Sequence, residues 1–395
     1  MNQVFQIRGA GVLSCYGSGL QAAVNGINNG ECRLNLLNSQ LNSSGEDIWV
    51  SQLNREDDID QLGVEVINQA LNHCQVRPTE SELQKCGLFV GTVSSDSRKV
   101  EMEYRQKRLQ GEDPAPLCGP SGGRLATRLA DSFSLGGPVV TINTACSSSL
   151  NALYQAMLYI QEGKIERALV MGIDVLNAMV VFGFRSLMLL SDDGCHPFDA
   201  KRAGIQLGES LSAIILEKSN TSQGVSSGDS ENIFSGNSFG NADLYLPYCR
   251  NTHSHPTALD PEGFEANEVM KAALESVSVS PDNIVAVKAH GTGSREGDAS
   301  EMIALARLFP DGVPLTSLKR YLGHSMGAAA LSELVVYLAC LESGFVPKCL
   351  GYSQTDISPS IDALYEHFTG IGGYHLLNFF GFGSSLSSLV IKWKG

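Results

Sequence analysis

The chain reads TINTACSSSL over residues 141–150, and the interpretation of the whole sequence starts from this stretch. Val139, Val140 and Ile142 form an apolar run typical of a buried strand, and a helix is predicted to begin two or three residues after Cys146. The free N–H groups and the positive dipole end of that helix would face the cysteine. Both favour thiolate over thiol, so we expect the pKa of Cys146 to fall from ~8.5 toward neutrality.

The same stretch also fits a capped helix beside an inert core cysteine, because serines are good N-cap residues. This segment alone leaves both interpretations open.

Along the rest of the chain, short β-branched runs alternate with helical patterns, which indicates a layered α/β architecture. Strands are expected over residues 87–92, 138–143, 168–173, 211–217, 283–289 and 313–317. Helices are expected over residues 62–74, 148–161, 264–277 and 328–341. Residues 219–231 are polar and rich in Ser, Asn, Gly and Asp, so we interpret them as an exposed connector. The predicted halves are residues 1–230, which carry Cys146, and residues 231–395.

Two histidines of the second half follow expected strands. His290 comes directly after residues 283–289, and His324 lies between the strand at 313–317 and the helix from 328. Open α/β sheets place their ligands at strand exits. A lone histidine is more often structural than catalytic, but two at equivalent exits, together with a helix-start cysteine, indicate a catalytic site.

These residues lie in motifs that resemble the signature blocks of β-ketoacyl-acyl-carrier-protein synthases, the condensing enzymes of type II fatty acid and polyketide synthesis. The three catalytic blocks are TACSS (144–148), HGTG (290–293) and KxxxGHxxGAA (319–329). Two flanking blocks, PFDxxRxGxxxGE (197–209) and NFFGFG (378–383), agree in order and spacing. The resemblance covers the whole chain. It implies a thiolase-like five-layer αβαβα fold made of two similar halves, usually dimeric.

The resemblance also implies roles for the catalytic residues. Cys146 would take an acyl chain from a carrier-protein thioester. His290 and His324 would bind the malonyl thioester carbonyl and stabilise the enolate left by decarboxylation. The chemistry requires such groups, because acyl transfer needs a thiolate and decarboxylation needs preorganised donors for an oxygen anion.

Three supporting residues follow from the same resemblance. Lys319 matches the family lysine that keeps the histidine site electropositive, and Glu301 matches the family acid downstream of the first histidine. Phe382 matches the aromatic residue whose backbone N–H, with that of Cys146, forms the acyl oxyanion hole. The substrates would arrive on the phosphopantetheine of an acyl carrier protein, so no cofactor or metal bound by this chain is implied.

The chain departs from the family pattern at two glycine-rich loops. Gly381-Phe382-Gly383 continues into Ser384-Ser385-Leu386 where the family has Gly-Thr-Asn, and residues 208–212 read GESLS instead of GEGAG. Fewer glycines mean less freedom for positive φ, so we expect differently shaped loops. Some relatives are chain-length-factor subunits that pair with an active synthase and commonly lack the cysteine. A chain-length-factor-like subunit of a heterodimeric ketosynthase is therefore the alternative function, and both homodimer and heterodimer stay open.

A remote alternative is a serine acyltransferase or hydrolase, because residues 323–327 satisfy G-x-S-x-G around Ser325. Acidic and histidine partners follow in the required order at Asp356, Asp362, His367 and His375. In a hydrolase the nucleophilic serine of this motif sits on the turn that directly follows a strand. Here residues 319–322 lie between the expected strand at 313–317 and the motif. This hypothesis also leaves Cys146 unexplained.

Charge, hydropathy and cysteine content limit the classes of binding partner and the cellular compartment that we expect for this chain. Lys and Arg number 28 against 42 Asp and Glu, a formal charge of −14, which disfavours a nucleic-acid role. No apolar stretch reaches the ~18 residues of a membrane helix, and no basic-then-apolar signal peptide opens the chain. The ten cysteines contain no Cys-x-x-Cys pair, so the chain is expected to be cytoplasmic. An acidic carrier protein would need a basic patch, for which we nominate a cluster at Arg98, Lys99, Arg105, Lys107 and Arg108, with Arg185 and Lys201 as further candidates.

Overall fold

The structure is a computed structural model and describes residues 3–38, 41–42, 45–55, 57–112, 122–219, 239–252 and 257–395. The predicted boundary between residues 230 and 231 lies outside the described residues, as does all of the predicted connector after Ser219.

Two groups of strands form the framework. The first half contributes β1 (Phe5–Ser14), β8 (Ser210–Lys218), β7 (Arg167–Asp174), β5 (Gly87–Gly91) and β6 (Val139–Ile142), neighbours in that order. The second half contributes β12 (Leu315–Thr316), β11 (Ile284–Lys288), β13 (Gly373–Gly381) and β14 (Ser385–Trp393), also in that order. Each half has three parallel strands followed by an antiparallel one: β6-β5-β7 with β8, and β12-β11-β13 with β14. The halves therefore share one topology, as predicted.

Short strands complete the sheet. The strand β9 (Ala242–Leu244) pairs with both β1 and β14 and so joins the two halves. The other short strands are β2 (Gly17–Ser18) on β1, β10 (Tyr248–Asn251) on β14, and the separate pair β3 (Asn35–Leu36) and β4 (Trp49–Val50).

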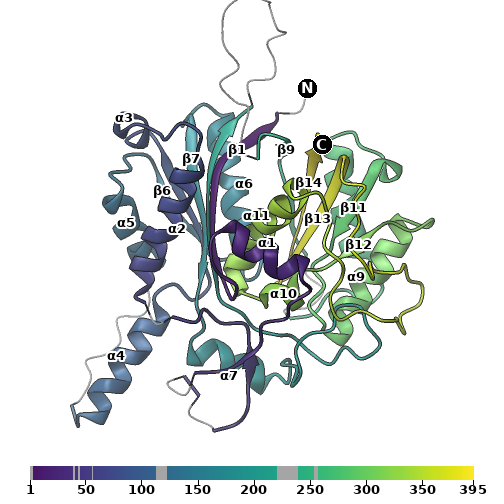
Figure 1. The fold of residues 1–395 in the computed structure, drawn as a ribbon, viewed down its shortest axis with the longest axis horizontal. Helices are drawn as coiled ribbons and strands as arrows, with labels where there is room; N and C mark the ends of the chain where they lie inside the picture. Colours follow the sequence, from purple (N-terminus) through teal and green to yellow (C-terminus); the bar gives the residue numbers. More distant parts are fainter. Residues whose placement is uncertain are drawn as a thin grey trace, which may run out of the picture.

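Helices cover both outer faces and fill the space between the strand groups (Figure 1). On the outer faces lie α2 (Ile59–His73) and α5 (Gly122–Ser132) for the first half, and α8 (Phe264–Ser276) and α9 (Arg295–Leu308) for the second. The central layer is α6 (Ser148–Gln161) and α11 (Ala329–Glu342). The remaining helices are α1 (Leu20–Asn28), α3 (Glu80–Leu83), α4 (Ser97–Leu109), α7 (Ala178–Ser186), α10 (Lys319–Leu322) and two 3-10 turns, Pro281–Asn283 and Met326–Ala328.

The alternation of side chains along β13 shows why the layers form. Leu377 and Phe379 pack into the central core with α6 and α11, while Leu376 and Phe380 pack into the outer core with α8 and α9. Successive strand residues point to opposite faces, so a strand that is apolar on both faces must be covered on both sides. The five-layer αβαβα fold is thus confirmed.

The predicted elements are present with ends shifted by a few residues, and α6 has the predicted bounds of 148–161. The long strands β1, β13 and β14 were not predicted. Buried polar residues interrupt the apolar pattern of the latter two: His375 bonds Tyr337 inside the core, and Ser388 bonds Asn378.

A close approach between β5 and α6 places the first half of the site. A Cβ atom on Gly91 would lie 2.3 Å from the backbone N and Cα of Ser149, so only glycine allows this contact. The start of α6 is therefore held directly against the sheet.

In the described part of the chain, no helix is long and apolar enough to span a membrane. Those residues also contain no group of three His, Cys, Asp or Glu side chains suited to a metal ion.

Candidate active site

Cys146 lies in the turn between β6 and α6. The preceding residue, Ala145, has a left-handed φ of 51°, and α6 begins at Ser148. The Ser148 hydroxyl accepts from the Thr144 N–H at 2.9 Å and donates to the Ala145 carbonyl, and Asn151 donates to the Thr144 hydroxyl at 2.7 Å. This local network holds the cysteine in one orientation.

His324 contacts the cysteine directly: its Nε2 lies 2.9 Å from Cys146 Sγ, although the two residues are 178 apart in sequence. The backbone N–H of His324 donates to the Gln206 carbonyl at 2.7 Å. We had expected His324 at a strand exit, and this prediction is wrong. The helix α10 separates it from β12, and Gly323, with φ 71°, turns the chain toward Gly208.

His290 completes the group from the second half. It follows β11 by two residues, and its ring centroid lies 5.6 Å from that of His324, with the planes nearly perpendicular at 88°. Cys146, His290 and His324 line one cavity of about 440 Å³. The structure therefore brings the three predicted catalytic residues together.

Glu301 acts on the backbone of the histidine loop. Its carboxylate accepts the N–H groups of His290 and Gly291, both at 2.9 Å, and the Asn378 amide at 3.1 Å. The predicted supporting residue thus lies beside His290, and its contacts show that it orients the loop rather than touching the imidazole.

Asp298 has a similar position that was not singled out as a site residue. Its carboxylate accepts the N–H groups of Thr292 and Gly293, and that of Phe198 at 2.7 Å. Burial raises the pKa of Asp298 to about 7. The available signal was its spacing from Glu301, which puts both acids on neighbouring turns of one helix facing the same loop.

Lys319 is completely buried and pairs with Glu333 of α11. The same carboxylate also binds Lys288, the last residue of β11. Neither Glu333 nor Lys288 was predicted. The available signals were an acid among the apolar residues in the middle of the helix from Ala329 and a lysine that ends an apolar strand.

Phe382 lines the cavity beside Cys146, and its ring stacks on Phe184 with centroids 5.7 Å apart. Its backbone N–H and that of Cys146 both stabilise a negative charge on the sulfur. Both N–H groups therefore lie near the nucleophile, and their role as the acyl oxyanion hole stays a prediction.

The expected lowering of the Cys146 pKa is wrong. Burial raises the pKa of the thiol to about 11, only partly offset by the charge of Lys319 and the Phe382 N–H. The two N–H groups that follow Cys146 are already bonded, since Ser148 N donates to the Ala145 carbonyl and Ser147 N to that of Thr144. At neutral pH the cysteine is a thiol.

Both histidines are neutral. Burial, together with the positive charge of Lys319, holds the pKa of His290 and of His324 well below the usual range. The site thus combines a thiol with two neutral imidazoles that can donate an N–H.

The serines at the unusual loops take part in the site. Ser384 adopts the left-handed φ of 57° that a glycine would favour, so the loop keeps this conformation without it. The Ser385 hydroxyl lies 2.8 Å from that of Ser147 and ties the Phe382 loop to the cysteine turn.

The serine-hydrolase hypothesis is not supported by the geometry. Ser325 is buried, and its hydroxyl lies 2.6 Å from that of Ser210, which also bonds Ser332. His375 bonds Tyr337, and His367 bonds the backbone of residues 28 and 348. The acids are also engaged, Asp356 with Arg202 and Asp362 with Tyr352.

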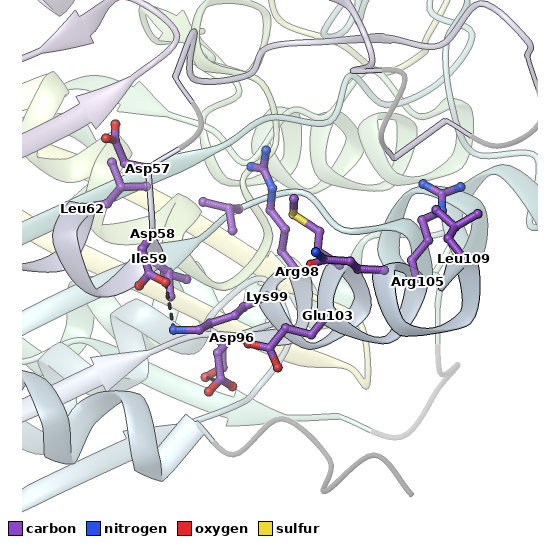
Figure 2. A pocket seen from close by; sticks show the side chains of 14 residues that line it. Asp57, Asp58, Ile59, Leu62, Asp96, Arg98, Lys99, Glu103, Arg105 and Leu109 are labelled. Atoms are coloured by element: carbon purple, nitrogen blue, oxygen red, sulfur yellow. Dashed lines mark hydrogen bonds and ion pairs between the residues drawn. The ribbon is translucent and has the colours of Figure 1, made fainter. Parts of the chain in front are cut away.

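The nominated basic cluster lies on α4, which extends away from the body of the molecule (Figure 1). Figure 2 shows this helix beside the start of α2, where Lys99 bonds Asp58 at 2.8 Å. Arg98 pairs with Glu209 at 2.9 Å. Of the cluster, Arg98, Lys99 and Arg105 line a separate cavity of about 720 Å³, and Cys146 does not line it. The exposed residues that line the Cys146 cavity instead include Leu187, Met188, Arg295 and Glu296.

Fold and site together define a thiolase-like condensing-enzyme scaffold with a Cys-His-His constellation. Residues 20–222 match the family described as "Beta-ketoacyl synthase, N-terminal domain", and residues 247–353 match "Beta-ketoacyl synthase, C-terminal domain". The chain belongs to the β-ketoacyl synthase family.

The proteins similar to this chain include polyketide synthases. The tetracenomycin polyketide synthase ketoacyl synthase alpha subunit of Streptomyces glaucescens is 25% identical over 345 residues, which cover 80% of this chain and 76% of that protein. The lovastatin diketide synthase of Aspergillus terreus is 27% identical over 85% of this chain. This chain spans only 13% of the length of that synthase.

Solved structures confirm the fold. The complex of a type II polyketide synthase acyl-carrier protein with its ketosynthase bound to the hexaketide, AntDE:AntF, matches with a TM-score of 0.86 and 21% identity, covering 100% of both chains. The ketosynthase ApeO with its chain length factor ApeC, from Xenorhabdus doucetiae, matches with a TM-score of 0.82 and 22% identity, covering 99% of this chain and 98% of that chain.

Proposed function

We propose that this protein is a β-ketoacyl-acyl-carrier-protein synthase that joins a malonyl unit to an acyl chain by decarboxylative Claisen condensation. The observation that carries the proposal is the 2.9 Å contact between His324 Nε2 and Cys146 Sγ inside a cavity that His290 also lines. A nucleophile, a group to share its proton and a second N–H donor are the minimum set for this reaction.

Acyl transfer comes first. His324 shares the thiol proton, Cys146 sulfur attacks the acyl carbonyl, and the backbone N–H groups of Cys146 and Phe382 stabilise the tetrahedral oxyanion. The bond to the phosphopantetheine sulfur of the carrier protein breaks, and that sulfur leaves with the proton. Because the thiol has a raised pKa and His324 is a weak base, the reactive form is the small thiolate fraction, which increases with pH and which His324 contacts.

Condensation follows. His290 and His324 donate N–H groups to the malonyl thioester oxygen, carbon dioxide leaves, and the electron pair moves into the enolate. The enolate carbon attacks the acyl carbonyl on Cys146, and the C–S bond breaks. The Cys146 sulfur leaves as a thiolate and takes up a proton from solvent, while the β-ketoacyl product stays on the carrier protein. Each step uses groups of this chain, and the substrates arrive on the phosphopantetheine arm.

The alternative is a chain-length-factor-like role in a heterodimer. The presence of Cys146, His290 and His324 in one cavity favours a catalytic role. The alternative is supported by similar proteins that are subunits of larger synthases or complexes with a chain length factor. For either role we propose that a second ketosynthase-like subunit pairs along β6, a sheet edge where Val139 is 39% exposed. An uncovered edge strand readily accepts another strand.

For the carrier protein we propose docking at the mouth of the Cys146 cavity. Leu187 and Met188 are 54% and 88% exposed and line this cavity, as do the exposed Arg295 and Glu296. The two apolar side chains would supply contact area, and Arg295 would be the group that attracts an acidic carrier, against the opposing charge of Glu296 and the overall charge of −14. Reversing Arg295 to Glu should slow loading from the carrier more than loading from a short soluble thioester. The α4 triple reversal of Arg105, Lys107 and Arg108 to Glu is the matched control.

The test of function uses intact-mass analysis and carbon dioxide release. Wild-type protein, purified alone and with any co-expressed sister subunit, should gain the mass of the acyl group, and Cys146→Ala should not. His290→Ala should load the acyl chain but release carbon dioxide ~10²–10³ times more slowly. Acylation that survives in Cys146→Ala, or normal carbon dioxide release in His290→Ala, would refute the proposal. Absence of both activities in wild-type protein with every partner would favour the subunit role.

A further inference from the structure

Lys288 occupies a position that the reaction described so far does not use. It is the last residue of β11, two residues before His290, and none of its surface is exposed. Its ammonium group binds Glu333 and lies 3.7 Å from the centroid of the Phe379 ring. A fully buried lysine is rare because its charge is costly to desolvate.

The charge count around Glu333 makes the lysine more unusual. Lys319 and Glu333 alone would form a neutral buried pair. Lys288 adds a second ammonium to the same carboxylate, which leaves the cluster with one net positive charge. A buried pair that is already balanced gains no compensation from a further charge. The charge of Glu301, which accepts three N–H groups of its own, acts on Lys288 from outside this cluster. The extra cation can therefore act on neighbouring groups other than Glu333.

The neighbouring groups show what this cation acts on. Lys288 faces Glu333 on α11, Lys319 on α10 and, farther off, Glu301 on α9, while the ring of Phe379 on β13 covers it. The charges of Lys288 and Lys319 both act on His290 and His324 and disfavour a second proton on either ring. The cluster thus acts on the two imidazoles rather than on a distant surface.

We propose that Lys288 is a positioning residue for decarboxylation, whose ammonium holds the Glu333 carboxylate together with Lys319 and adds positive charge beside the two imidazoles. This inference rests on the proposed function. As the bond to the carboxylate carbon breaks, carbon dioxide leaves and the electron pair becomes an enolate. Neutral imidazoles donate N–H bonds to the enolate oxygen, and the cluster's positive charge stabilises its negative charge. Lys288 itself neither gains nor loses a proton in the reaction.

The pH dependence has a definite sign. Burial lowers the pKa of Lys288 to about 8. As pH rises through that value the cluster loses its net charge, so carbon dioxide release should decline. Burial raises the pKa of the Cys146 thiol to about 11, so acyl loading should increase over the same range. The two half-reactions should therefore respond to alkali in opposite directions.

The decisive variant is Lys288→Met, which keeps an unbranched chain against Phe379 and leaves the Lys319–Glu333 pair intact. The matched control is Lys271→Met, because Lys271 is an exposed lysine of α8 that pairs with Glu275. Two readouts are used: carbon-13 NMR titration of the histidine rings, assigned with His290→Gln and His324→Gln, and single-turnover carbon dioxide release from malonyl carrier protein.

In Lys288→Met we expect both imidazoles to become protonated at higher pH than in wild type. Carbon dioxide release at pH 7 should fall about tenfold. This is more than the loss expected on removing an exposed charge and less than the loss on removing a group that hydrogen-bonds the oxyanion. Acyl loading of Cys146 should change less than about twofold, and Lys271→Met should match wild type in every assay. Unchanged histidine titration in a folded Lys288→Met protein would overturn the inference, whatever its stability.

The outcomes separate this inference from the proposed function. If wild type releases no carbon dioxide, the proposed function fails, and the NMR titration still decides the influence of Lys288 on the histidines. If Lys288→Met does not fold, the wild-type pH profile decides. A decline of carbon dioxide release above about pH 8 with rising acyl loading supports the inference, and parallel profiles overturn it.

Discussion

Replacing Glu301 with glutamine tests whether the histidine loop needs an acceptor-only side chain. One carboxylate oxygen accepts from His290 N and from Asn378, and the other accepts from Gly291 N, at distances of 2.9 to 3.1 Å. Glutamine has one carbonyl oxygen and one NH₂ group. In the better orientation its oxygen keeps the first two donors, and its NH₂ group meets the N–H of Gly291.

The free-energy cost of Glu301→Gln can be worked out from the acceptor that the Gly291 N–H loses. One hydrogen bond to a charged acceptor disappears and a buried N–H is left without a partner, which together cost about 2–4 kcal/mol. The loop can relieve this conflict only by moving Gly291, and His290 moves with it. We therefore expect carbon dioxide release to fall at least ~10-fold, because a donor displaced from the enolate oxygen loses most of its effect. Loading of Cys146 should stay within about twofold, because Cys146 and His324 do not contact Glu301.

The assays are urea unfolding and single-turnover measurement of the two half-reactions. Glu268→Gln, an exposed glutamate on α8, is the matched control and should lie within about 0.5 kcal/mol of wild type. Wild-type stability and normal carbon dioxide release in Glu301→Gln would refute the reasoning, since they would show that the loop does not depend on the carboxylate.

Three further predictions follow from the buried groups. Because burial raises the pKa of Cys146 to about 11, acyl loading from a soluble thioester should rise between pH 6.5 and 8.5, approaching ~10-fold per pH unit; a flat profile would indicate a preformed thiolate. Ser325→Ala should keep wild-type acylation and lower the free energy of unfolding by about 1 kcal/mol, because Ser210 loses one partner; loss of acylation would revive the hydrolase hypothesis. Burial lowers the pKa of His375 to about 4, so this side chain resists protonation in the folded protein. The free energy of unfolding should therefore fall as pH is lowered from about 6.5 to 4, by roughly 3 kcal/mol at most. His375→Gln should flatten this part of the stability profile, measured by urea unfolding at each pH, and an unchanged slope would contradict the assignment.

The sequence by itself determined the features that depend on neighbouring residues. The apolar periodicity of residues 148–161 defined α6 with its observed bounds, and the alternation of strands and helices indicated the layered architecture. The motifs around Cys146, His290 and Lys319 identified the family, because each is a short turn or loop whose residues lie within a few positions of one another. The expectation that these three blocks meet in one site came from the resemblance, and the structure agrees with it.

Only the tertiary structure decided the electrostatics. Local sequence placed Cys146 at a helix start and so predicted a lowered pKa. Burial by both halves of the molecule reverses that shift. The pairing of Lys288 with Glu333 spans 45 residues, and the contact between the Ser147 and Ser385 hydroxyls spans 238. No pattern of near neighbours specifies such partners, because their proximity arises from packing α11 against β11 and the start of β14 against the turn before α6. Desolvation depends on everything that surrounds a group, so it becomes defined only when the layers close.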